Sequence, residues 1–466
     1  MTDTTTSTGT LDTLRAGFTG SVLTPADDDY ATARAPWNGA IAARPAVIAR
    51  CATPDDVGAA LAHARGEGLE IGVRGGAHSY GGAPLPEGGL TVDLSLLRHV
   101  VVDPAARRAR CGGGVTQGEL DAATQQHGLA VTGGTISHTG VGGLTLGGGM
   151  GWLTRRCGLA VDNLRSAQVV LADGRCVRAA PDSHPDLFWA LTGGGGNFGV
   201  VTEFEFALHP VGPIVHFGLL FWEIDRGAAA LRVARDVADA LPRDCGALIA
   251  GFNAPPAPFV PEAHHHTLGI ALLIAGLSDA QPQAAPLAEA RAALHPLFEV
   301  GTDMPYTALQ QILDDAAPWG IHAYGKALYL DELSDAAIDV IAGRLPAKVS
   351  PMSLMPIFPL GGAFADVAED DTAFGGRRSA RYAVNIDAAT PDPRLLPADR
   401  EWVRSTWDAL RPHAGDSGSY VNFMTEFEPD RVAAAYGPVK FARLAAIKAS
   451  YDPDNVFHRN ANIPPA

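Results

Sequence analysis

The sequence predicts an α+β chain of two unlike parts, and three observations carry this prediction. Near the N-terminus, a helical pattern, a short apolar strand and a glycine-rich loop follow one another over residues 53–82. From about residue 211 the pattern changes to long apolar strands separated by amphipathic helices, which is typical of an antiparallel sheet covered by helices. A helical segment over 431–457 then ends at the sequence Asp-Pro-Asp-Asn.

The first element is a helix whose start and end are marked by residue type. Thr53 is a good N-cap, Pro54 suits the first helical position, and Asp55 favours the positive end of the helix dipole. Gly66 is expected to end this helix, and residues 69–73 then form a short strand. This strand leads directly into the loop "GVRGGAHSYGG".

The later elements follow from the same patterns of periodicity and turn residues. In the first part, β patterns precede a further helix, over residues 89–97, 99–115 and 116–128. In the second part, strands are expected over residues 213–224, 264–277 and 349–358. The amphipathic helices of that part are expected over residues 226–241, 279–294 and 333–345.

Composition and charge exclude several classes of protein. The 466 residues are 47% hydrophobic and 18% charged, as in a globular chain of two or three domains. A formal net charge of −16 repels phosphate backbones, so no nucleic acid partner is expected. No apolar run reaches the length of a membrane span, and residues 1–17 do not resemble a secretion signal. With five cysteines and no CxxC spacing, we expect free thiols and a cytoplasmic location. The N-terminal segment over 1–35 is expected to be a mobile tail.

Four glycine-dense segments point to a long ligand that lies along the backbone. They are residues 72–82, 131–135, 140–153 and 193–202. Backbone N–H groups in such loops bind phosphate without the help of lysine. The last segment contains G-x-G-x-x-G, but a helix precedes it and a strand follows it, which reverses the order of a Rossmann fingerprint. One such segment alone is compatible with a tight turn, whereas four together favour cofactor binding.

Four longer motifs are ordered along the chain: "RGGAHSYGG", "TGVGGLTLGGGMGWLTRRCGLAVDNL", "DLFWALTGGGGNFGVVTEF" and "YDPDNVFHRNANIPP". Together they resemble the FAD-linked oxidases of the berberine bridge enzyme-like group, in the vanillyl-alcohol oxidase superfamily. The resemblance covers about residues 36–466 and implies a two-part FAD-binding domain of the PCMH type, over 36–210 and 420–466. A substrate domain over 211–419 is then inserted between the two parts.

The resemblance assigns a covalent bond with the 8α-methyl group of the flavin to His78, in the first glycine loop. The alternative interpretation of His78 is a histidine that is only hydrogen-bonded in a turn, and outside such a loop this interpretation would be favoured. Many relatives have a second covalent link through a cysteine, and Ile136 stands at that place here, so a single link is expected. Cys157 follows two arginines that would lower the pKa of its thiol, but its position does not match, and a free thiol is favoured.

The FAD site that the resemblance implies follows the glycine segments and the C-terminal motif. The residues expected there, besides His78, are Val73, Arg74, Gly75, Gly76, Ala77, Ser79, Gly82, Thr132, Gly133, Gly134, Thr139, Gly140, Gly142, Gly143, Thr145, Gly147, Gly148, Gly149, Gly196, Asn197, Gly199, Val200, Val201, Tyr420, Asn422, Asn460 and Asn462.

The resemblance also places a tyrosine of a Y-x-N motif at the flavin, and "SYVNFM" supplies Tyr420 and Asn422. Such a tyrosine takes a proton from the substrate OH or NH as a hydride leaves for the flavin. Because the pKa of a free tyrosine is about 10, a base of this kind needs a cation or strong donors. Lys326 is the candidate cation, and Tyr324 lies on the same face of its strand. The alternatives are a core aromatic for Tyr420 and a solvated residue for Lys326.

The strand over 349–358 is expected to form part of the floor of the substrate pocket. Its alternating side chains, with a tyrosine from a later segment, form the predicted pocket: Met352, Leu354, Pro356, Phe358 and Tyr382. These side chains predict a largely apolar substrate. Arg377, Arg378 and Arg381 either recognise an acidic group or, as favoured, form a solvated edge. Three adjacent histidines over 264–266 do not share one ion on a strand, so no metal site is expected.

The sequence therefore predicts a covalent FAD oxidase that acts on a small or medium organic molecule, such as an alcohol, an amine or a natural-product intermediate. The resemblance places an oxygen-gating position at Thr139, whose small side chain predicts molecular oxygen as acceptor and hydrogen peroxide as product. Two alternatives stay open: a flavin dehydrogenase with another electron acceptor, and a catalytically silent flavin-binding protein. The substrate identity and the oligomeric state stay open as well.

Overall fold

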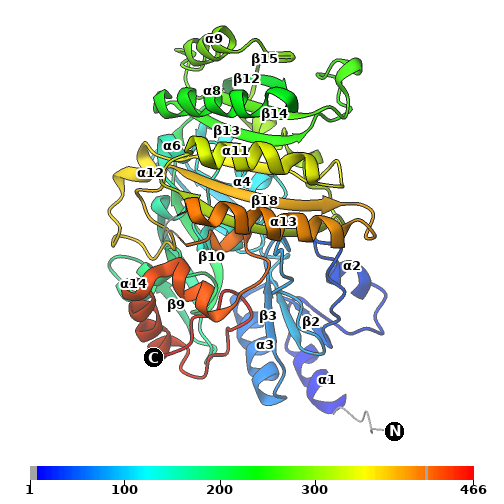
Figure 1. Ribbon diagram of the computed structural model, residues 1–466. Helices are drawn as coiled ribbons and strands as arrows, with labels where there is room; N and C mark the ends of the chain where they lie inside the picture. Colours follow the sequence, from blue (N-terminus) through cyan, green and yellow to red (C-terminus); the bar gives the residue numbers. More distant parts are fainter. Residues whose placement is uncertain (1–7, 415–417) are drawn as a thin grey trace.

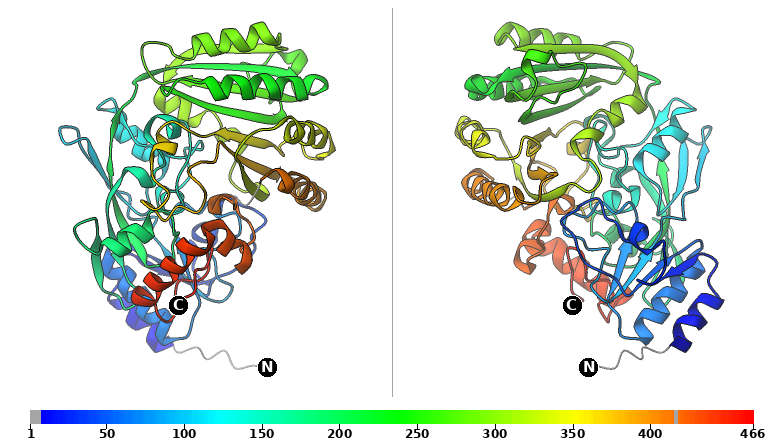
Figure 2. Two further views of the ribbon diagram at one scale, coloured as in Figure 1. Left: turned by 60° about the vertical axis from the view of Figure 1, so that its left-hand side comes forward. Right: turned by 90° about the vertical axis from the view of Figure 1, so that its right-hand side faces the viewer.

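The computed structural model describes residues 8–414 and 418–466. In Figure 1, a large sheet with its helices forms the upper part of the molecule, and two smaller sheets lie below it. Both views of Figure 2 show the C-terminal segment, in red, beside the N-terminal segments, in blue and cyan. Described segments from both terminal parts of the chain therefore belong to the lower part, while residues 214–390 contain all strands of the upper sheet.

The first small sheet carries the glycine loop that contains His78. Its strand order is β1–β2–β4–β3, and β2 and β3 both run parallel to β4. The strands are β1 Ser21–Leu23, β2 Val47–Arg50, β3 Ile71–Arg74 and β4 Leu90–Asp93. The predicted helix is α3, Pro54–Gly66, where Thr53 and Asp56 form a capping box that fixes its first turn. β3 then delivers the chain to the glycine loop, as the sequence predicts.

The prediction of a mobile tail over residues 1–35 is wrong for the residues that the structure describes. Helix α1 (Thr8–Ala16) places Leu14 in the core under α3, and β1 pairs with β2. The Tyr30 ring at the start of α2 (Tyr30–Arg34) is buried, and its hydroxyl donates to the Pro45 carbonyl at 2.7 Å. Buried apolar side chains and satisfied polar groups hold this segment in place. Residues 1–7 lie outside the described residues.

The second small sheet is antiparallel and has the strand order β5–β6–β10–β8–β9. Its strands are β5 Val100–Asp103, β6 Arg108–Gly112, β8 Leu164–Val170, β9 Cys176–Ala179 and β10 Val200–Ala207. A short pair beside it consists of β7 Leu129–Ala130 and β11 His209–Pro210. The connections contain α4 Gln117–Gln125, α5 Val141–Leu146, α6 Thr154–Cys157 and α7 Pro185–Leu191. The fourth glycine segment lies between α7 and β10, which is the predicted helix-to-strand order.

The large sheet is antiparallel throughout, with the strand order β15–β12–β14–β13–β17–β18–β16. Its strands are β12 Ile214–Glu223, β13 Cys245–Asn253, β14 Leu268–Gly276, β15 Phe298–Pro305, β16 His322–Leu330, β17 Met355–Pro359 and β18 Tyr382–Thr390. The predicted strand over 349–358 is shorter than expected, because residues 351–352 form a turn, Leu354 forms a single bridge with Asp387, and β17 itself begins at Met355. The predicted domain bounds themselves stay a prediction.

Helices cover one face of the large sheet, and the other face packs toward the lower part. The covering helices are α8 Gly227–Ala240, α9 Ala284–Ala293, α11 Asp335–Arg344 and α13 Leu396–Leu410, and Figure 1 shows α8, α11 and α13 in front of the strands. Side chains such as Leu328 and Ile386 pack under these helices. Their neighbours in the strands, such as Tyr329 and Ala383, face the other way, toward Trp152 and Tyr420.

The C-terminal segment returns to the lower part through α14, Pro429–Tyr451, which is interrupted by non-helical backbone at Gly437. The fully buried Lys448 ammonium donates to the Asp452 carboxylate at 2.6 Å and to the carbonyls of Asn197 and Phe457. A buried cation with three partners fixes the turn that follows α14. The segment 457–461 thereby reaches the first glycine loop, where Arg459 pairs with Glu70 on the strand side.

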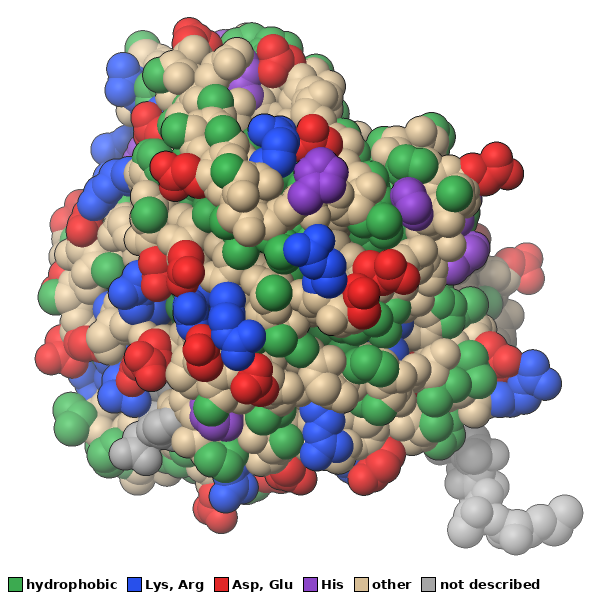
Figure 3. Space-filling model, turned by 45° about the horizontal axis from the view of Figure 1, so that its top comes forward, with side chains coloured by type: hydrophobic (Ala, Val, Ile, Leu, Met, Phe, Trp, Pro, Cys, Tyr) green, Lys and Arg blue, Asp and Glu red, His purple; other side chains and the backbone are tan. Residues whose placement is uncertain are grey.

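The remaining connections of the upper part contain α10 Tyr306–Gln311 and α12 Ala363–Asp366. None of the helices within 8–414 and 418–466 is long and apolar enough to cross a membrane. Of the three adjacent histidines, His264 ends a 3-10 turn and the other two follow it before β14 begins, and the described residues hold no cluster of metal-ligand side chains. On the face in Figure 3, acidic and basic side chains are interspersed and form no single basic patch.

Candidate active site

A cavity of about 360 Å³ lies where the glycine loops meet the segments after β18 and α14. Its walls come from four distant parts of the chain: residues 71–84, 134–150, 195–204 and 420–461. Trp37, Leu94 and Gly113 from the lower part, and Ala317 and Phe358 from the upper part, complete the lining. This volume lies within the range of small-molecule and cofactor sites.

Two glycine loops cross each other at the cavity, and the crossing leaves no room for side chains. A Cβ atom on Gly76 would lie 2.2 Å from the Gly140 nitrogen, and one on Gly140 would lie 2.3 Å from the Gly76 nitrogen. Ala77, which follows, has a φ of 55° and turns the backbone so that His78 reaches the cavity wall. Bare backbone at this crossing is what a loop needs to approach a large ligand closely.

The His78 imidazole lies at the cavity wall inside a group of aromatic rings. It stacks on Trp37 with the ring centroids 5.0 Å apart and meets the Trp319 ring edge-on at 5.7 Å. Its Nε2 is 2.7 Å from Nδ1 of His138. Burial, and next the neighbouring His138, lower the pKa of His78 to about 3. His78 is therefore a neutral imidazole with a nucleophilic nitrogen near neutral pH.

Some buried polar atoms at the loops lack a hydrogen-bond partner among the described residues. Arg74 Nη1, at the start of the first loop, and Asn460 Oδ1, at the cavity, are two of them. The carboxylate closest to Arg74 is Asp93, 4.0 Å away. Arg74 does not reach the cavity wall, whereas the unpaired Asn460 oxygen lies at the cavity and fits a bound group that carries its own polar atoms, because buried acceptors are rarely left unpaired. A dinucleotide with a pyrophosphate is such a group, and loop amides of the kind present here bind phosphate.

The Tyr420 hydroxyl oxygen accepts two hydrogen bonds at the cavity wall. The donors are the Gly149 backbone nitrogen at 2.8 Å and the Asn422 amide at 2.9 Å. Gly147 leaves the space for that amide, because a Cβ atom there would lie 2.1 Å from Asn422 Oδ1. Burial raises the pKa of Tyr420 to about 12, although both donors act to lower it. The arrangement orients the phenol but keeps it protonated near neutral pH.

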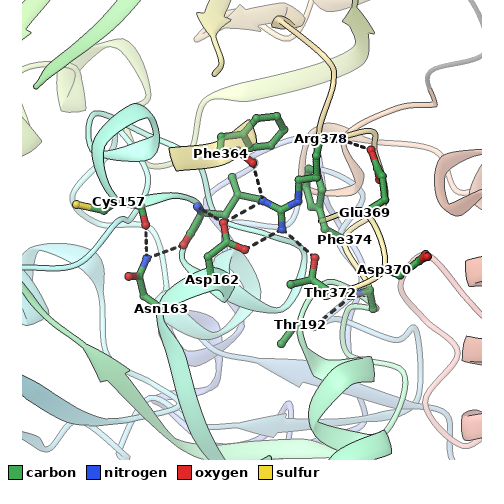
Figure 4. Close-up of polar contacts among 12 residues, drawn as sticks. Cys157, Asp162, Asn163, Thr192, Phe364, Glu369, Asp370, Thr372, Phe374 and Arg378 are labelled. Atoms are coloured by element: carbon green, nitrogen blue, oxygen red, sulfur yellow. Dashed lines mark hydrogen bonds and ion pairs between the residues drawn. The ribbon is translucent and has the colours of Figure 1, made fainter. Parts of the chain in front are cut away.

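A buried ion pair holds the loop that packs against Tyr420. Arg378 donates to both Asp162 oxygens, at 2.7 and 2.9 Å, and to the Thr372 hydroxyl at 2.8 Å (Figure 4). Its guanidinium also lies 5.0 Å from the centre of the Phe374 ring. The Phe374 ring in turn lies 6.2 Å from the Tyr420 ring. The expected solvated edge is thus wrong for Arg378, because its partner comes from a segment 216 residues away.

Comparison with known proteins decides which family has this arrangement. The family described as FAD binding domain matches residues 45–180, and the family described as berberine and berberine like matches residues 419–464. The (R)-6-hydroxynicotine oxidase of Paenarthrobacter nicotinovorans is 31% identical over 463 residues, which cover 96% of this chain and 97% of that protein. The chain belongs to the berberine bridge enzyme-like FAD-linked oxidoreductases.

Solved structures similar to this chain have the same fold from end to end. The 6-hydroxy-D-nicotine oxidase of Arthrobacter nicotinovorans has a TM-score of 0.85 and 27% identity, and the match covers 96% of this chain and 98% of that one. The glucooligosaccharide oxidase of Acremonium strictum has a TM-score of 0.85 and 23% identity, with 98% and 99% covered. This berberine bridge enzyme-like chain is therefore an FAD-linked oxidoreductase with the expected α+β fold, and FAD is its cofactor.

Most residues predicted for FAD do line the cavity of this oxidoreductase. They are Val73, Gly75, Gly76, Ala77, His78, Ser79, Gly134, Thr139, Gly140, Gly142, Gly143, Gly147, Gly196, Gly199, Val200, Val201, Tyr420, Asn422 and Asn460. The remaining ones do not reach its wall: Arg74, Gly82, Thr132, Gly133, Thr145, Gly148, Gly149, Asn197 and Asn462. Several of these support the wall from behind. Gly149 binds Tyr420, and Asn197 donates to the carbonyls of Gly194 and Ala461.

Lys326 and Tyr324 do not accompany Tyr420, which corrects the prediction of a cation beside this tyrosine. They share a strand face, as predicted, but it is the face under α13. Lys326 Nζ lies 5.0 Å from the centre of the Trp407 ring of α13 and 3.6 Å from Glu426. The Tyr324 hydroxyl donates to Glu426 at 2.9 Å. Alternation fixes which residues share a face, but tertiary packing decides which face meets the flavin.

The predicted substrate pocket needs a similar correction. Among its five residues only Phe358 lines the cavity; Met352, Leu354, Pro356 and Tyr382 do not. Met352 lies before the start of β17 and packs near Trp37. Tyr382 points under the helices, where its hydroxyl donates to Asp239 of α8 at 2.5 Å. Met352 misses the pocket because β17 begins only at Met355, and Tyr382 misses it because its side chain lies on the face of β18 that the helices cover.

The structure places the two residues expected near the flavin edge at the cavity and Cys157 away from it. Ile136 and Thr139 are both part of the lining. Cys157 is buried in the core between the lower and upper parts, and burial raises the pKa of its thiol to about 11 although Arg156 acts to lower it. It is therefore a structural thiol rather than a nucleophile at the cavity.

Sequence reasoning missed several residues that contact the cavity or His78: Trp37, Tyr80, His138, Met150, Trp319, Phe423 and Phe427. Most of them are single aromatic residues outside any glycine motif, so no local pattern distinguishes them from core residues. His138 differs from the others, because the sequence holds a signal for it. It stands two residues after Ile136, beside the place of the second covalent link, and that spacing is a signal that could have been used.

Proposed function

We propose that this chain is an oxidase with FAD bound covalently through His78 alone. The observation that carries the proposal is the neutral His78 imidazole at the wall of a cavity built from glycine loops. The glucooligosaccharide oxidase, which shares the fold, has a 6-S-cysteinyl, 8α-N1-histidyl FAD. Ile136 has no nucleophile, and Cys157 is not at the cavity, so His78 is the residue of this chain that fits a covalent role.

FAD, when bound, supplies the acceptor for a hydride from the substrate. The residues around it orient the substrate and keep water out. The Gly149 N–H and the Asn422 amide hold the Tyr420 oxygen at the wall, where this oxygen is proposed to take the proton of a substrate hydroxyl. Because Lys326 lies away from the site, backbone N–H groups and the Asn422 amide are what favours a Tyr420 phenolate there.

We propose a small or medium, largely apolar substrate. Trp37, Met150, Phe358 and Phe423 give the cavity an apolar wall, and burial of apolar surface on them favours an apolar molecule. The similarity to (R)-6-hydroxynicotine oxidase is in keeping with an organic substrate of that size. Alcohols, amines and natural-product intermediates stay within the proposal.

We propose molecular oxygen as the acceptor, with hydrogen peroxide as product. Thr139 lines the cavity with a small side chain, at the place that gates oxygen in relatives. We also propose a cytoplasmic location, on the ground that all five cysteines are free thiols in this fold. Cell fractionation followed by immunoblotting tests the location, and its appearance in a secreted or periplasmic fraction would refute it.

The test of the proposed function begins with the purified protein on a denaturing gel. The wild-type band should fluoresce under ultraviolet light after acid treatment, and a His78→Ala variant should release its flavin into the supernatant. Anaerobic mixing with candidate amines and alcohols should then bleach the flavin absorbance, and readmission of air should yield peroxide equal to the flavin reduced. Bleaching without fast reoxidation in air would identify a dehydrogenase. A flavin that no candidate of either class bleaches would favour a catalytically silent binding protein.

A further inference from the structure

A second, much smaller cavity adjoins the first glycine loop and is separate from the one described above. It measures about 10 Å³, which is room for about one atom the size of a water oxygen. Two arginines, Arg34 and Arg74, belong to its lining, and neither of them lines the large cavity. Ala77 and Ser79 line both cavities, so the loop that carries His78 is a wall of each.

The Arg74 guanidinium is buried with N–H donors that have no protein partner. Its side chain is 13% exposed, and its Nε and Nη1 have no hydrogen-bond partner within residues 8–414 and 418–466. Asp93 lies 4.0 Å from Nε of Arg74 and 3.6 Å from Nε of Arg50. Two guanidinium groups therefore share one carboxylate, and one positive charge at this place is not compensated.

Arg34, the last residue of α2, adds a second positive charge to the lining. Its Nη1 donates to the Ala43 carbonyl at 2.9 Å, and it forms no ion pair with the part of the chain that the structure describes. Burial lowers the pKa of Arg74, while Asp93 acts to raise it and Arg50 to lower it further. An excess of positive charge with unpaired N–H donors favours an anion at this place over a neutral molecule.

The size of the cavity limits the kind of anion. Phosphate, sulfate and carboxylates contain several heavy atoms, whereas the cavity has room for about one. A monatomic anion needs only N–H and O–H donors around it. Besides the two guanidinium groups, the Ser79 hydroxyl is available as a donor, because its oxygen accepts from the Ala83 nitrogen at 3.2 Å and its own proton is free to point elsewhere.

We propose that this cavity binds a chloride ion between the guanidinium groups of Arg34 and Arg74. The ion compensates the charge that Asp93 leaves, and it links the end of α2 with the end of β3. Because Ala77 and Ser79 are part of the same wall, the bound ion stabilises the loop conformation in which Ala77 has a φ of 55°. The site is independent of the proposed covalent link and of the substrate.

Bromide, which replaces chloride and is located by its anomalous X-ray scattering, tests the position of the ion. Crystals of the flavin-loaded protein in sodium bromide should show an anomalous peak between the guanidinium groups of Arg34 and Arg74. Arg34→Met should lose this peak at the same bromide concentration. Arg44→Met, an exposed arginine of the same segment outside the cavity, is the matched control and should keep it. A wild-type protein without the peak, or a peak of equal height in Arg34→Met, would overturn the proposal.

Thermal melts test whether the ion stabilises the fold. Sodium concentration and ionic strength are held constant while chloride replaces gluconate, which is too large for the cavity. Each tenfold increase in chloride above its dissociation constant should lower the unfolding equilibrium constant about tenfold, which raises the Tm of a chain of 466 residues by about 1.4 °C. The increase should be absent in Arg34→Met and present in Arg44→Met. Melting that is independent of chloride in wild type, or equally dependent in Arg34→Met, would contradict a built anion site and leave an adventitious ion only.

Discussion

Replacement of Arg378 by methionine tests how the loop behind Tyr420 is held. Methionine keeps the unbranched apolar stem of the side chain but removes two hydrogen bonds to Asp162 and one to Thr372. The side chains of Arg378 and Asp162 are only 3% and 7% exposed, so water cannot replace these contacts. Breaking a buried ion pair by removal of one partner costs about 3–5 kcal/mol, because the other charge stays buried.

That free energy converts into a shift that a thermal melt resolves. An unfolding entropy of about 2.1 cal/mol/K per residue over 466 residues gives roughly 1 kcal/mol/K. Arg378→Met should therefore melt about 3–5 °C below wild type, measured by circular dichroism or flavin fluorescence. The control is Arg291→Met, which removes an ion pair with Glu299 whose side chains are about half exposed. Such surface pairs contribute about 0–1 kcal/mol, so the control should shift by about 1 °C or less.

The double variant Asp162→Leu with Arg378→Met separates the buried charge from the packing. Removal of both partners leaves no unpaired charge, and only the bond from the Leu159 nitrogen to Asp162 is lost in addition. A hydrogen bond to a charged group contributes about 1.5–3 kcal/mol, which is less than the cost of an unpaired buried charge, so the double variant should melt above Arg378→Met. A double variant that melts at or below the single variant, or an Arg378→Met protein as stable as wild type, would refute the reasoning from buried charge.

Four further predictions concern Tyr420, Lys326 and Thr139, and they are tested by stopped-flow measurement of flavin reduction without air or of its reoxidation by oxygen. Tyr420→Phe should keep the flavin but reduce it about 10²–10⁴-fold more slowly with an alcohol; equal rates at every pH would remove Tyr420 from the mechanism. Because the pKa of Tyr420 is raised to about 12, the wild-type rate with an alcohol should rise with pH, up to tenfold per unit, and this rise should be absent in Tyr420→Phe. Lys326→Met should leave both the rate and its pH profile within about twofold of wild type, since Lys326 lies under α13; a large loss would return it to the site. Thr139→Leu should slow reoxidation by oxygen while substrate reduction of the flavin persists; unchanged reoxidation would exclude Thr139 as the gate.

Local patterns in the sequence predicted the parts of the fold that local chemistry determines. Helix α3 begins after the N-cap Thr53 as predicted, because the cap and its partners lie within one turn of helix, and the structure adds a capping box with Asp56. The glycine loops and His78 meet at one cavity, since only glycine allows the close crossing at Gly76 and Gly140. The four long motifs, in their order along the chain, predicted the family, and the comparisons confirm this prediction.

Contacts between distant segments account for what the sequence did not predict. Arg378 has the sequence context of a surface edge, and only the approach of Asp162 makes it a buried residue. The face of β16 that meets the flavin depends on where α13 packs, so alternation alone placed Lys326 on the wrong side. The segment 8–35 lacks a strong motif, and it is ordered because β1 forms an antiparallel pair with β2 at the edge of the first small sheet.

The missing cation at Tyr420 bears on the kind of substrate that suits the cavity. An alcohol must lose its hydroxyl proton as the hydride leaves, and a phenol with a pKa of about 12 is a poor acceptor for that proton near neutral pH. A neutral amine has no such need, because the nitrogen lone pair supports the positive charge that develops on the carbon. Among the proposed substrates, an amine that is already uncharged therefore depends less on Tyr420 than an alcohol does, and the rate with an alcohol is expected to rise as the pH approaches the pKa of Tyr420.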